Sequence, residues 1–128
     1  MTNKPENSMS IKRSPCPLAA SLDYLGDKWS LLIIRDMLLG RKLYSDFQQS
    51  PENIPTNILA DRLKRLQHAG LVKKQLYQQH PPRYEYLLTE MGADLLPVLQ
   101  ALGKWGKKHI PGTRIMMKAE VPSNKESE

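Results

Sequence analysis

The chain has 128 residues, of which 40% are hydrophobic, so its length and composition suit one compact domain and make a second domain unnecessary. It carries 19 Lys and Arg residues against 13 Asp and Glu residues, and the net charge of +6 favours a polyanionic partner without identifying it. No apolar run approaches the roughly 20 residues that cross a bilayer, and the amino terminus lacks the apolar stretch of a signal peptide, so we expect a cytoplasmic protein with no membrane partner.

The amino-terminal part of the sequence predicts a flexible arm followed by two helices. Residues 1–14 are polar and show no helical stripe, so they are expected to form the arm. Pro17 and Gly26 suit the start and the end of the first helix. Asp27 is expected to cap the second helix, Lys28 to Leu39, by accepting from its free N–H groups. The apolar face of that helix is predicted to contain Trp29, Leu32, Ile33 and Met37.

Residues 43–70 predict two further helices around a short turn. Leu43 to Phe47 reads as a short helix, and the breaking residues 50–53 separate it from the next one. The following segment, Pro55 to Gly70, has leucines at helical spacing, which predicts one buried face. These leucines are Leu59, Leu63 and Leu66. The spacing alone favours an ordinary amphipathic core helix, and the segment that follows shifts the interpretation.

The opposite face of the Pro55–Gly70 helix is polar. A rotation of about 100° per residue places Asn57, Ala60, Asp61 and Lys64 there, with Arg65 at the margin. Two helices around a short turn, the second with a polar outer face, match the way a helix-turn-helix docks in the major groove of DNA.

The ends of this helix carry recognisable signals. Pro55 suits its start because proline has a fixed φ, and Thr56 or Asn57 is expected to cap its free N–H groups. Gly70 is expected to end the helix in a left-handed conformation.

A β-hairpin is expected directly after the helix. Leu71–Tyr77 and Arg83–Leu88 have strand-like compositions, and Gln78–Pro82 forms the turn. Arg83 can reach a phosphate or a narrow minor groove, whereas Lys73 is either a phosphate contact or a solvated charge that protects a strand edge. A helix-turn-helix followed by a two-stranded wing is a winged helix, so the expected fold class is α+β and mainly α.

The carboxy-terminal part predicts one long helix. Thr89 is its expected cap, and the helix runs from Glu90 to about His109. Pro97 lies within it and predicts either a bend or a later start. Residues 111–128 are expected to form a flexible tail, which leaves residues 15–110 as the folded domain.

The first and last helices both carry apolar stripes, and we expect them to form a homodimer. A dimer would place two equivalent helices on half-sites about one turn of double-stranded DNA apart, and the operator would then be palindromic. Packing of these helices within one chain is the alternative, and it predicts a monomer. The residues expected at the dimer interface are Leu18, Leu22, Leu95, Leu99, Leu102 and Trp105.

Several short motifs follow one another between Cys16 and Trp105. These are Cys16-Pro17, Gly26-Asp27-Lys28-Trp29, Leu39-Gly40, Tyr44-Ser45-Asp46-Phe47, the segment Ile54 to Leu63, Gly70-Leu71-Val72, the segment Pro81 to Tyr86, and Leu88-Thr89. In their order and spacing the sequence resembles the HxlR-type winged-helix transcriptional regulators, which are related in shape to the MarR group. The resemblance implies a dimer built from terminal helices, a recognition helix that begins near Pro55, a wing tipped by Arg83, and control of a neighbouring gene in response to a small chemical stress.

Base recognition is expected to depend on the start of the recognition helix. Asn57 can pair with adenine, Thr56 can bond a base edge or a phosphate, and Ala60 can meet a thymine methyl. Asp61 either accepts from cytosine or pairs with Lys64 or Arg65, and Arg62 either braces the helix or reaches a phosphate. The full set of residues expected to contact DNA is Tyr44, Pro55, Thr56, Asn57, Ala60, Asp61, Lys64, Arg65, Lys73 and Arg83.

The signal that controls such a regulator is left open between a thiol oxidant and a small molecule. Cys16, the one cysteine, precedes Pro17 at a helix amino terminus, where the helix dipole can favour a thiolate; several HxlR-type proteins are thought to sense oxidants in this way. An inert, packed cysteine is the alternative. An aromatic small molecule could instead bind near Tyr24, Trp29 and Trp105, although such residues are often plain core.

Catalysis finds little support in the sequence. The histidines His68, His80 and His109 are scattered, and there is no second cysteine and no glycine-rich phosphate loop. We therefore expect no enzyme, no metal and no cofactor. The competing functions are an architectural DNA-binding protein and a winged-helix module that binds other proteins.

Overall fold

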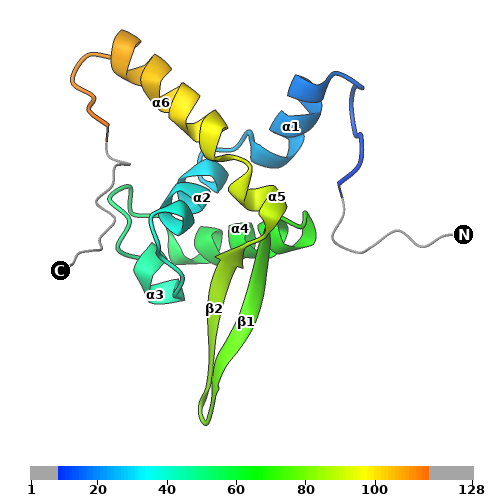
Figure 1. Ribbon diagram of the computed structural model, residues 1–128, viewed down its shortest axis with the longest axis vertical. Coiled ribbons are helices and arrows are strands. Elements are labelled where there is room, and N and C mark those ends of the chain that lie inside the picture. Colours follow the sequence, from blue (N-terminus) through cyan, green and yellow to red (C-terminus); the bar gives the residue numbers. More distant parts are fainter. Residues whose placement is uncertain (1–8, 116–128) are drawn as a thin grey trace, which may run out of the picture.

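The computed structural model describes residues 9–115, so most of the expected amino-terminal arm and the tail from residue 116 onward lie outside the described residues. The fold is the expected mainly α winged helix-turn-helix (Figure 1). Its elements are α1 (Pro17–Leu25), α2 (Ser30–Leu38), α3 (Tyr44–Phe47), α4 (Thr56–His68), β1 (Val72–Gln79), β2 (Pro82–Leu88), α5 (Glu90–Ala93) and α6 (Leu96–His109).

The helices α2, α3 and α4 surround the core. Leu59, Leu63 and Leu66 of α4 are buried, as their spacing predicts, against Ile33 of α2 and Phe47 of α3 in one apolar cluster. Burial of a leucine side chain stabilises a fold by about 1.5 to 3 kcal/mol, so this stripe fixes the rotation of α4 about its own axis. Its polar face must therefore point outward.

The ends of α2 and α4 confirm some of the predicted caps and correct others. Asp27 accepts from the backbone N–H groups of Trp29 and Ser30 at 2.8 and 3.0 Å, so it caps α2 as expected, although the helix starts later, at Ser30. Gly70 ends α4 with a φ of 84°, and the N–H of Leu71 reaches back to the carbonyl of Leu66 at 3.0 Å.

The predicted side-chain cap of α4 is wrong. The helix starts at Thr56, with Pro55 in the cap position and no capping side-chain hydrogen bond there. Thr56 and Asn57 thus occupy the first helical turn, where their side chains point outward and the residues cannot act as the cap.

The apolar face of α2 is also rotated from its predicted position. Ile33 and Met37 are buried as expected, but Ile34 is fully buried while Leu32 and Trp29 are partly exposed. Helix α2 is covered on more than one side, since it contacts both the hairpin and α6, and a face assigned from a single stripe does not capture this.

The hairpin is longer than predicted. The strands β1 and β2 are antiparallel, and pairing continues through Gln78 with Arg83 and Gln79 with Pro82, so the expected five-residue turn is wrong. A register shift between Leu76 and Gln78 lets the ladder continue to the tip. The N–H of Tyr86 also donates to the carbonyl of Lys42 at 2.8 Å, which fastens the hairpin to the segment before α3.

The expected continuous helix from Glu90 to His109 is wrong, because it is divided into α5 and α6. Thr89 caps α5 by accepting from the N–H of Gly92 at 3.1 Å. A Cβ at Gly92 would lie 2.2 Å from the carbonyl oxygen of Leu71, so α5 packs directly on the backbone after α4. A new helix, α6, starts at Leu96. Pro97 lies in its first turn, where backbone N–H groups have no partner within the helix, so the missing N–H of proline costs no hydrogen bond.

Figure 1 shows how these elements divide the molecule. The hairpin of β1 and β2 projects from one end, and α1 and α6 diverge from one another at the opposite end. Within residues 9–115, no helix is long and apolar enough to span a bilayer.

Candidate DNA-binding surface

The outward face of α4 is polar and accessible. All the residues predicted for this face are exposed, whereas the leucines on the other side have at most 1% of their surface exposed. The exposed set is Thr56, Asn57, Ala60, Asp61, Lys64 and Arg65, and Pro55 before them is exposed as well. Short polar groups and cations on one face of a helix are the groups that contact base edges and phosphates in a major groove.

Arg62 holds α4 against the start of α2. Its Nε lies 3.1 Å from Oδ1 of Asp27, and only 15% of its side chain is exposed. The sequence left open whether Arg62 braces the helix or reaches a phosphate, and the structure shows that it braces the helix. Burial raises the pKa of Asp27, but hydrogen bonds from the Ser30 hydroxyl, the amides of Trp29 and Ser30, and Arg62 outweigh it and lower the pKa to about 2.

Asp61 has its cationic partners on its own helix. Its carboxylate lies 3.0 Å from Nε of Arg65, one turn further along, and also accepts from Arg62. This is the internal pairing that the sequence offered as one alternative, with Arg65 as the partner. The pairing offsets the negative charge that Asp61 would otherwise present to a phosphate backbone.

Tyr44 positions the start of α4. Its hydroxyl donates to the backbone carbonyl of Thr56 at 3.0 Å, so α3 is fastened to the first turn of α4. Tyr44 was predicted to contact DNA; its hydroxyl is engaged with the protein, and the residue is partly exposed.

The cations of the hairpin are all exposed but differ in their contacts. Lys73 and Arg83 are exposed, and Arg83 lies next to the turn. Lys74 instead lies over the ring of Tyr84, with Nζ 4.6 Å from the ring centroid. Lys73 and Arg83 therefore keep the accessibility that a contact with phosphate requires.

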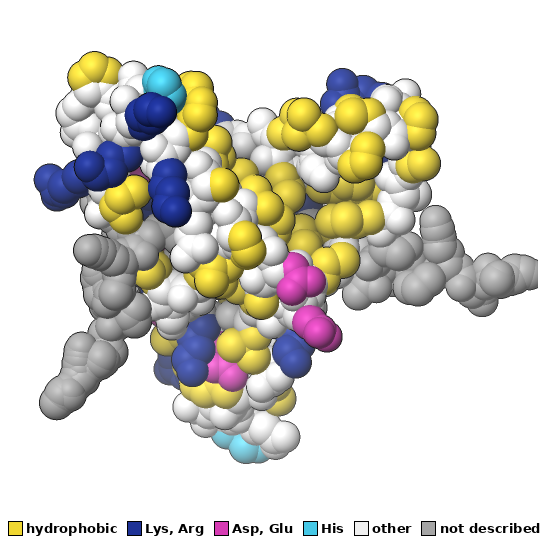
Figure 2. All heavy atoms as spheres, turned by 45° about the horizontal axis from the view of Figure 1, so that its top comes forward, with side chains coloured by type: hydrophobic (Ala, Val, Ile, Leu, Met, Phe, Trp, Pro, Cys, Tyr) yellow, Lys and Arg dark blue, Asp and Glu magenta, His cyan; other side chains and the backbone are white. Residues whose placement is uncertain are grey.

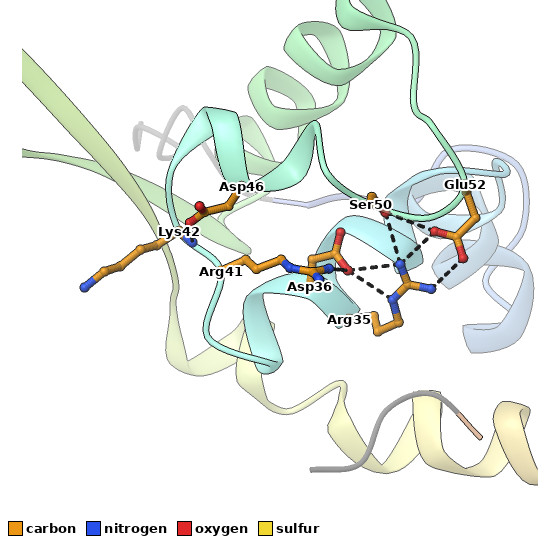
Figure 3. A network of polar contacts seen from close by, with 7 residues as sticks. All are labelled: Arg35, Asp36, Arg41, Lys42, Asp46, Ser50 and Glu52. Atoms are coloured by element: carbon orange, nitrogen blue, oxygen red, sulfur yellow. Dashed lines mark hydrogen bonds and ion pairs between the residues drawn. The ribbon is translucent and has the colours of Figure 1, made fainter. Parts of the chain in front are cut away.

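A polar network that sequence reasoning missed connects α2 to the turn before α4 (Figure 3). Nη1 and Nη2 of Arg35 each lie 2.8 Å from a carboxylate oxygen of Glu52, and Nη2 also donates to the Ser50 hydroxyl at 3.1 Å. Nε and Nη2 of the same guanidinium donate to Oδ1 of Asp36 at 3.1 and 3.0 Å. Nη1 of Arg41 lies 2.9 Å from the same oxygen. Bidentate pairing with a guanidinium fixes orientation as well as distance.

The electrostatics of this network favour its charged form. The hydrogen bonds from Arg35 hold the pKa of Glu52 at about 2, and Glu52 in turn raises the pKa of Arg35 above its ordinary value. The signal in the sequence was Asp36, which lies three residues after the buried Ile33 and is itself fully buried. A buried carboxylate needs a cationic partner, but its spacing does not reveal that Arg35 also reaches Glu52.

A family model described as HxlR-like helix-turn-helix matches residues 24–114. The chain belongs to this family. The resemblance that the sequence motifs indicated is thereby confirmed, and the chain is a helix-turn-helix transcriptional regulator.

The chain is similar to known regulators in sequence and to solved structures in fold. The HTH-type transcriptional regulator YdeP of Bacillus subtilis is 33% identical over 94 residues, which are 73% of this chain and 73% of YdeP. The crystal structure of PA1607, a proposed transcription factor, has a TM-score of 0.74 at 33% identity and covers 91% of this chain and 82% of PA1607. The redox regulator HypR in its reduced form has a TM-score of 0.68 at 32% identity and covers 74% of this chain and 94% of HypR.

The residues that were predicted for a dimer interface divide into two groups in this HxlR-family chain. Leu99 is only 7% exposed and lies in the core cluster, against which Leu95 packs, so both belong to the fold of one chain. The other four are exposed by about half or more: Leu18, Leu22, Leu102 and Trp105. Figure 2 shows apolar side chains along α6 and α1, on either side of a hollow between the two helices.

The three aromatic residues that were predicted as candidates for an effector pocket do not share either of two cavities in the described part of the chain. Tyr24 lines a small cavity beside Met9 and Leu95, and its hydroxyl donates to the carbonyl of Ser10 at 2.9 Å. Trp105 is 59% exposed and stacks on His109, with ring centroids 5.0 Å apart. A larger cavity of about 610 Å³ lies between α2 and α6, and neither tryptophan lines it.

Cys16 is the cap residue of α1 in this HxlR-family protein, and it is exposed. Its thiol makes no capping hydrogen bond. The predicted position at a helix amino terminus is confirmed, and within one chain the cysteine is not packed. No cluster of three or more metal-ligating side chains occurs in the part of the chain from residue 9 to residue 115.

Proposed function

We propose that this HxlR-family regulator binds a palindromic operator in double-stranded DNA as a homodimer and changes its affinity in response to a chemical signal. The observation that carries the proposal is the exposed polar face of α4, which begins with Thr56 and Asn57 and is held outward by a buried leucine stripe. Helix α4 is the recognition helix in this proposal.

Sequence readout comes from the first two turns of the recognition helix. Asn57 offers both a donor and an acceptor, which matches the N6 and N7 edge of adenine in the major groove. Thr56 bonds a base edge or a phosphate, and Ala60 leaves room for a thymine methyl. Lys64, Lys73 and Arg83 contact phosphates, which sets the register on the duplex and adds affinity for any sequence.

Dimerisation accounts for the exposed apolar residues of α1 and α6. Leu18 and Trp105 are 68% and 59% exposed, and an apolar surface of this kind is favourable only when a partner covers it. A second copy related by a twofold axis would cover it and bring two recognition helices to half-sites about one duplex turn apart.

A thiol oxidant is the signal we favour. Cys16 is exposed at the start of α1, two residues before Leu18 and six before Leu22, so a modified thiol would lie at the amino-terminal end of the helix that carries these proposed dimer residues. The similarity to HypR, a redox regulator, supports the same class of signal.

Selection of bound sequences from random duplex DNA at physiological salt tests the proposal. We expect an inverted repeat to be enriched, and its affinity to change when the selection is repeated with an oxidant. Binding without any sequence preference would favour an architectural DNA-binding protein instead. The absence of DNA binding together with a stable protein complex would favour an interaction module.

A further inference from the structure

A cavity of about 610 Å³ lies between α2, α6 and residues 113–115. Its apolar lining comes from both helices and from the segment after α6, and includes Leu31, Leu32, Leu99 and Ile115. Sites for small organic molecules are typically cavities of roughly 300 to 1,000 Å³ with a mostly apolar lining. The size and the lining therefore suit a small molecule with a substantial apolar part.

Two glycines of α6 keep this cavity open. Gly103 and Gly106 both line it, three residues apart on the same face of the helix. A Cβ at Gly103 would meet its nearest neighbour, Ile115, at 3.8 Å, so a side chain there has room and would extend into the open space. Glycine within a helix costs about 1 kcal/mol relative to alanine, and here the missing side chains leave volume that a ligand can occupy.

The charged residues around the cavity have one sign. Its lining includes Arg35, Lys104, Lys107 and Arg114 and contains no Asp or Glu. Arg35 is paired with Glu52 and Asp36, but among residues 9–115 no carboxylate lies within 4.0 Å of the other three cations. Figure 2 shows Lys and Arg side chains gathered at the outer end of α6. An apolar space bordered by exposed cations is complementary to an amphipathic anion.

This cavity adjoins the proposed dimer surface of α6, because Leu102 of that surface also lines the cavity, while the rest of the cavity lies further round the helix. At about 100° per residue, Trp105 lies within roughly 20° of Val98 around the helix, whereas Gly103 lies roughly 140° from it. Val98 and Trp105 are 49% and 59% exposed and do not line the cavity. A partner chain seated on that stripe thus leaves the Gly103 side of the helix accessible.

We propose that this cavity binds an amphipathic organic anion, such as a medium-chain carboxylate. The apolar part of the ligand packs on the leucines beside Gly103, and its carboxylate pairs with Lys104 and Lys107. Binding itself is independent of DNA. Its regulatory consequence rests on the proposed function: Arg35 lines the cavity and also holds Glu52 in the turn before α4, so a ligand packed against the Arg35 side chain changes the position of that guanidinium relative to Glu52.

Calorimetry on the full chain without DNA tests the site, with decanoate as the probe and decyltrimethylammonium as a cation of equal chain length. We expect decanoate to bind at least about tenfold more tightly than the cation. Gly103→Leu fills the cavity and should weaken decanoate binding by about tenfold or more. Gly103→Ala makes the same change in helix propensity while adding one methyl group, and should stay within about threefold of wild type.

The charge requirement is tested separately. Lys104→Gln combined with Lys107→Gln should weaken decanoate binding by about tenfold and remove its dependence on salt. Lys108→Gln removes one positive charge from the same helix at a residue that does not line the cavity, and should leave the affinity unchanged.

Three results would overturn the proposal. The first is equal binding of decanoate and the cation, and the second is equal affinity in Gly103→Leu and Gly103→Ala. The third is a change of oligomeric state in Gly103→Leu with decanoate affinity intact, because the groove would then be a contact between copies. If decanoate binds as expected while the DNA selection enriches no sequence, the proposed function fails and the site stands.

Discussion

Arg62 in the recognition helix and Asp27 at the start of α2 form an ion pair, with 3.1 Å between Nε and Oδ1. Asp27 simultaneously caps α2 through the amides of Trp29 and Ser30. The carboxylate of Asp27 therefore accepts from backbone N–H groups at the start of α2 and also holds Arg62, so that the Arg62 side of α4 faces α2. The orientation of the DNA-reading face is thus linked to the helix that crosses the core.

Arg62→Met should lower the free energy of unfolding by about 1 to 3 kcal/mol, because it leaves the carboxylate of Asp27 without its guanidinium partner. Arg65→Met is the matched control, since Arg65 also pairs with Asp61 but is 64% exposed and does not contact Asp27. It should change stability by less than about 0.5 kcal/mol. Urea unfolding of both variants measures the difference, and equal losses would show that the pair with Asp27 contributes nothing.

Stability should fall in acid because of Asp27 and Glu52. Both have a folded-state pKa of about 2, below the ordinary values of 3.8 and 4.5. A carboxylate with a lowered pKa stabilises the fold fully above its unfolded pKa, and this contribution is lost as the pH falls toward the folded pKa. The free energy of unfolding should therefore be level above about pH 5 and decrease between about pH 5 and pH 2.

The variants Asp27→Asn and Glu52→Gln test the origin of that acid dependence. Each should be less stable than wild type at pH 7, and each should lose about 1 kcal/mol less between pH 5 and pH 2. Curves that run parallel to wild type over this range would assign the acid sensitivity to other groups.

Local signals were sufficient for much of the fold. The leucine stripe of α4, the left-handed Gly70 and the cap at Asp27 each depend on residues a few positions apart, so the sequence predicts them directly. The exposed face of the candidate site followed from the same stripe. Helical periodicity fixes both faces of an amphipathic helix at once.

Contacts between distant segments were not predictable in this way. Arg35 and Glu52 are 17 residues apart, and no spacing rule pairs them. The division of α5 from α6 depends on the contact between Gly92 and the backbone of Leu71, while the sequence showed only Pro97. Leu95, Leu99 and Leu102 share one apolar pattern, yet the fold buries the first two and exposes the third. A pattern identifies an apolar side chain and does not identify what covers it.

Asn57→Ala should lower the preference for operator over random DNA by about 1 to 3 kcal/mol, because Asn57 is assigned to a base edge. Arg83→Ala should weaken binding to all sequences similarly and reduce the salt dependence, because Arg83 is assigned to phosphate. Titrations of both variants against operator and random duplexes separate the two roles. An unchanged affinity ratio in Asn57→Ala would reject its role in readout.

Dimerisation should depend on the exposed leucines of α1 and α6. Leu18→Glu and Leu102→Glu place a charge on residues that are 68% and 56% exposed in one chain, and each should shift the protein toward the monomer in analytical ultracentrifugation. Leu76→Glu is the matched control, because Leu76 in β1 is also 42% exposed but lies on the wing. A control that dissociates as readily as the α1 and α6 variants would place the interface elsewhere.

Oxidation should change operator affinity through Cys16. The thiol is exposed at the start of α1, and conversion to a sulfenic acid or a mixed disulfide adds polar or bulky atoms at the end of the helix that carries Leu18 and Leu22, where the proposed partner packs. Titration of operator binding with hydrogen peroxide, which gives the sulfenic acid, and with diamide plus glutathione, which gives the mixed disulfide, should show a loss of affinity in wild type and none in Cys16→Ser. The serine variant keeps a similar size at the same helix terminus, so its binding before oxidation should match wild type. Since Cys16 is the one cysteine of the chain, an equal response in both proteins would exclude a thiol switch and leave a small molecule as the signal.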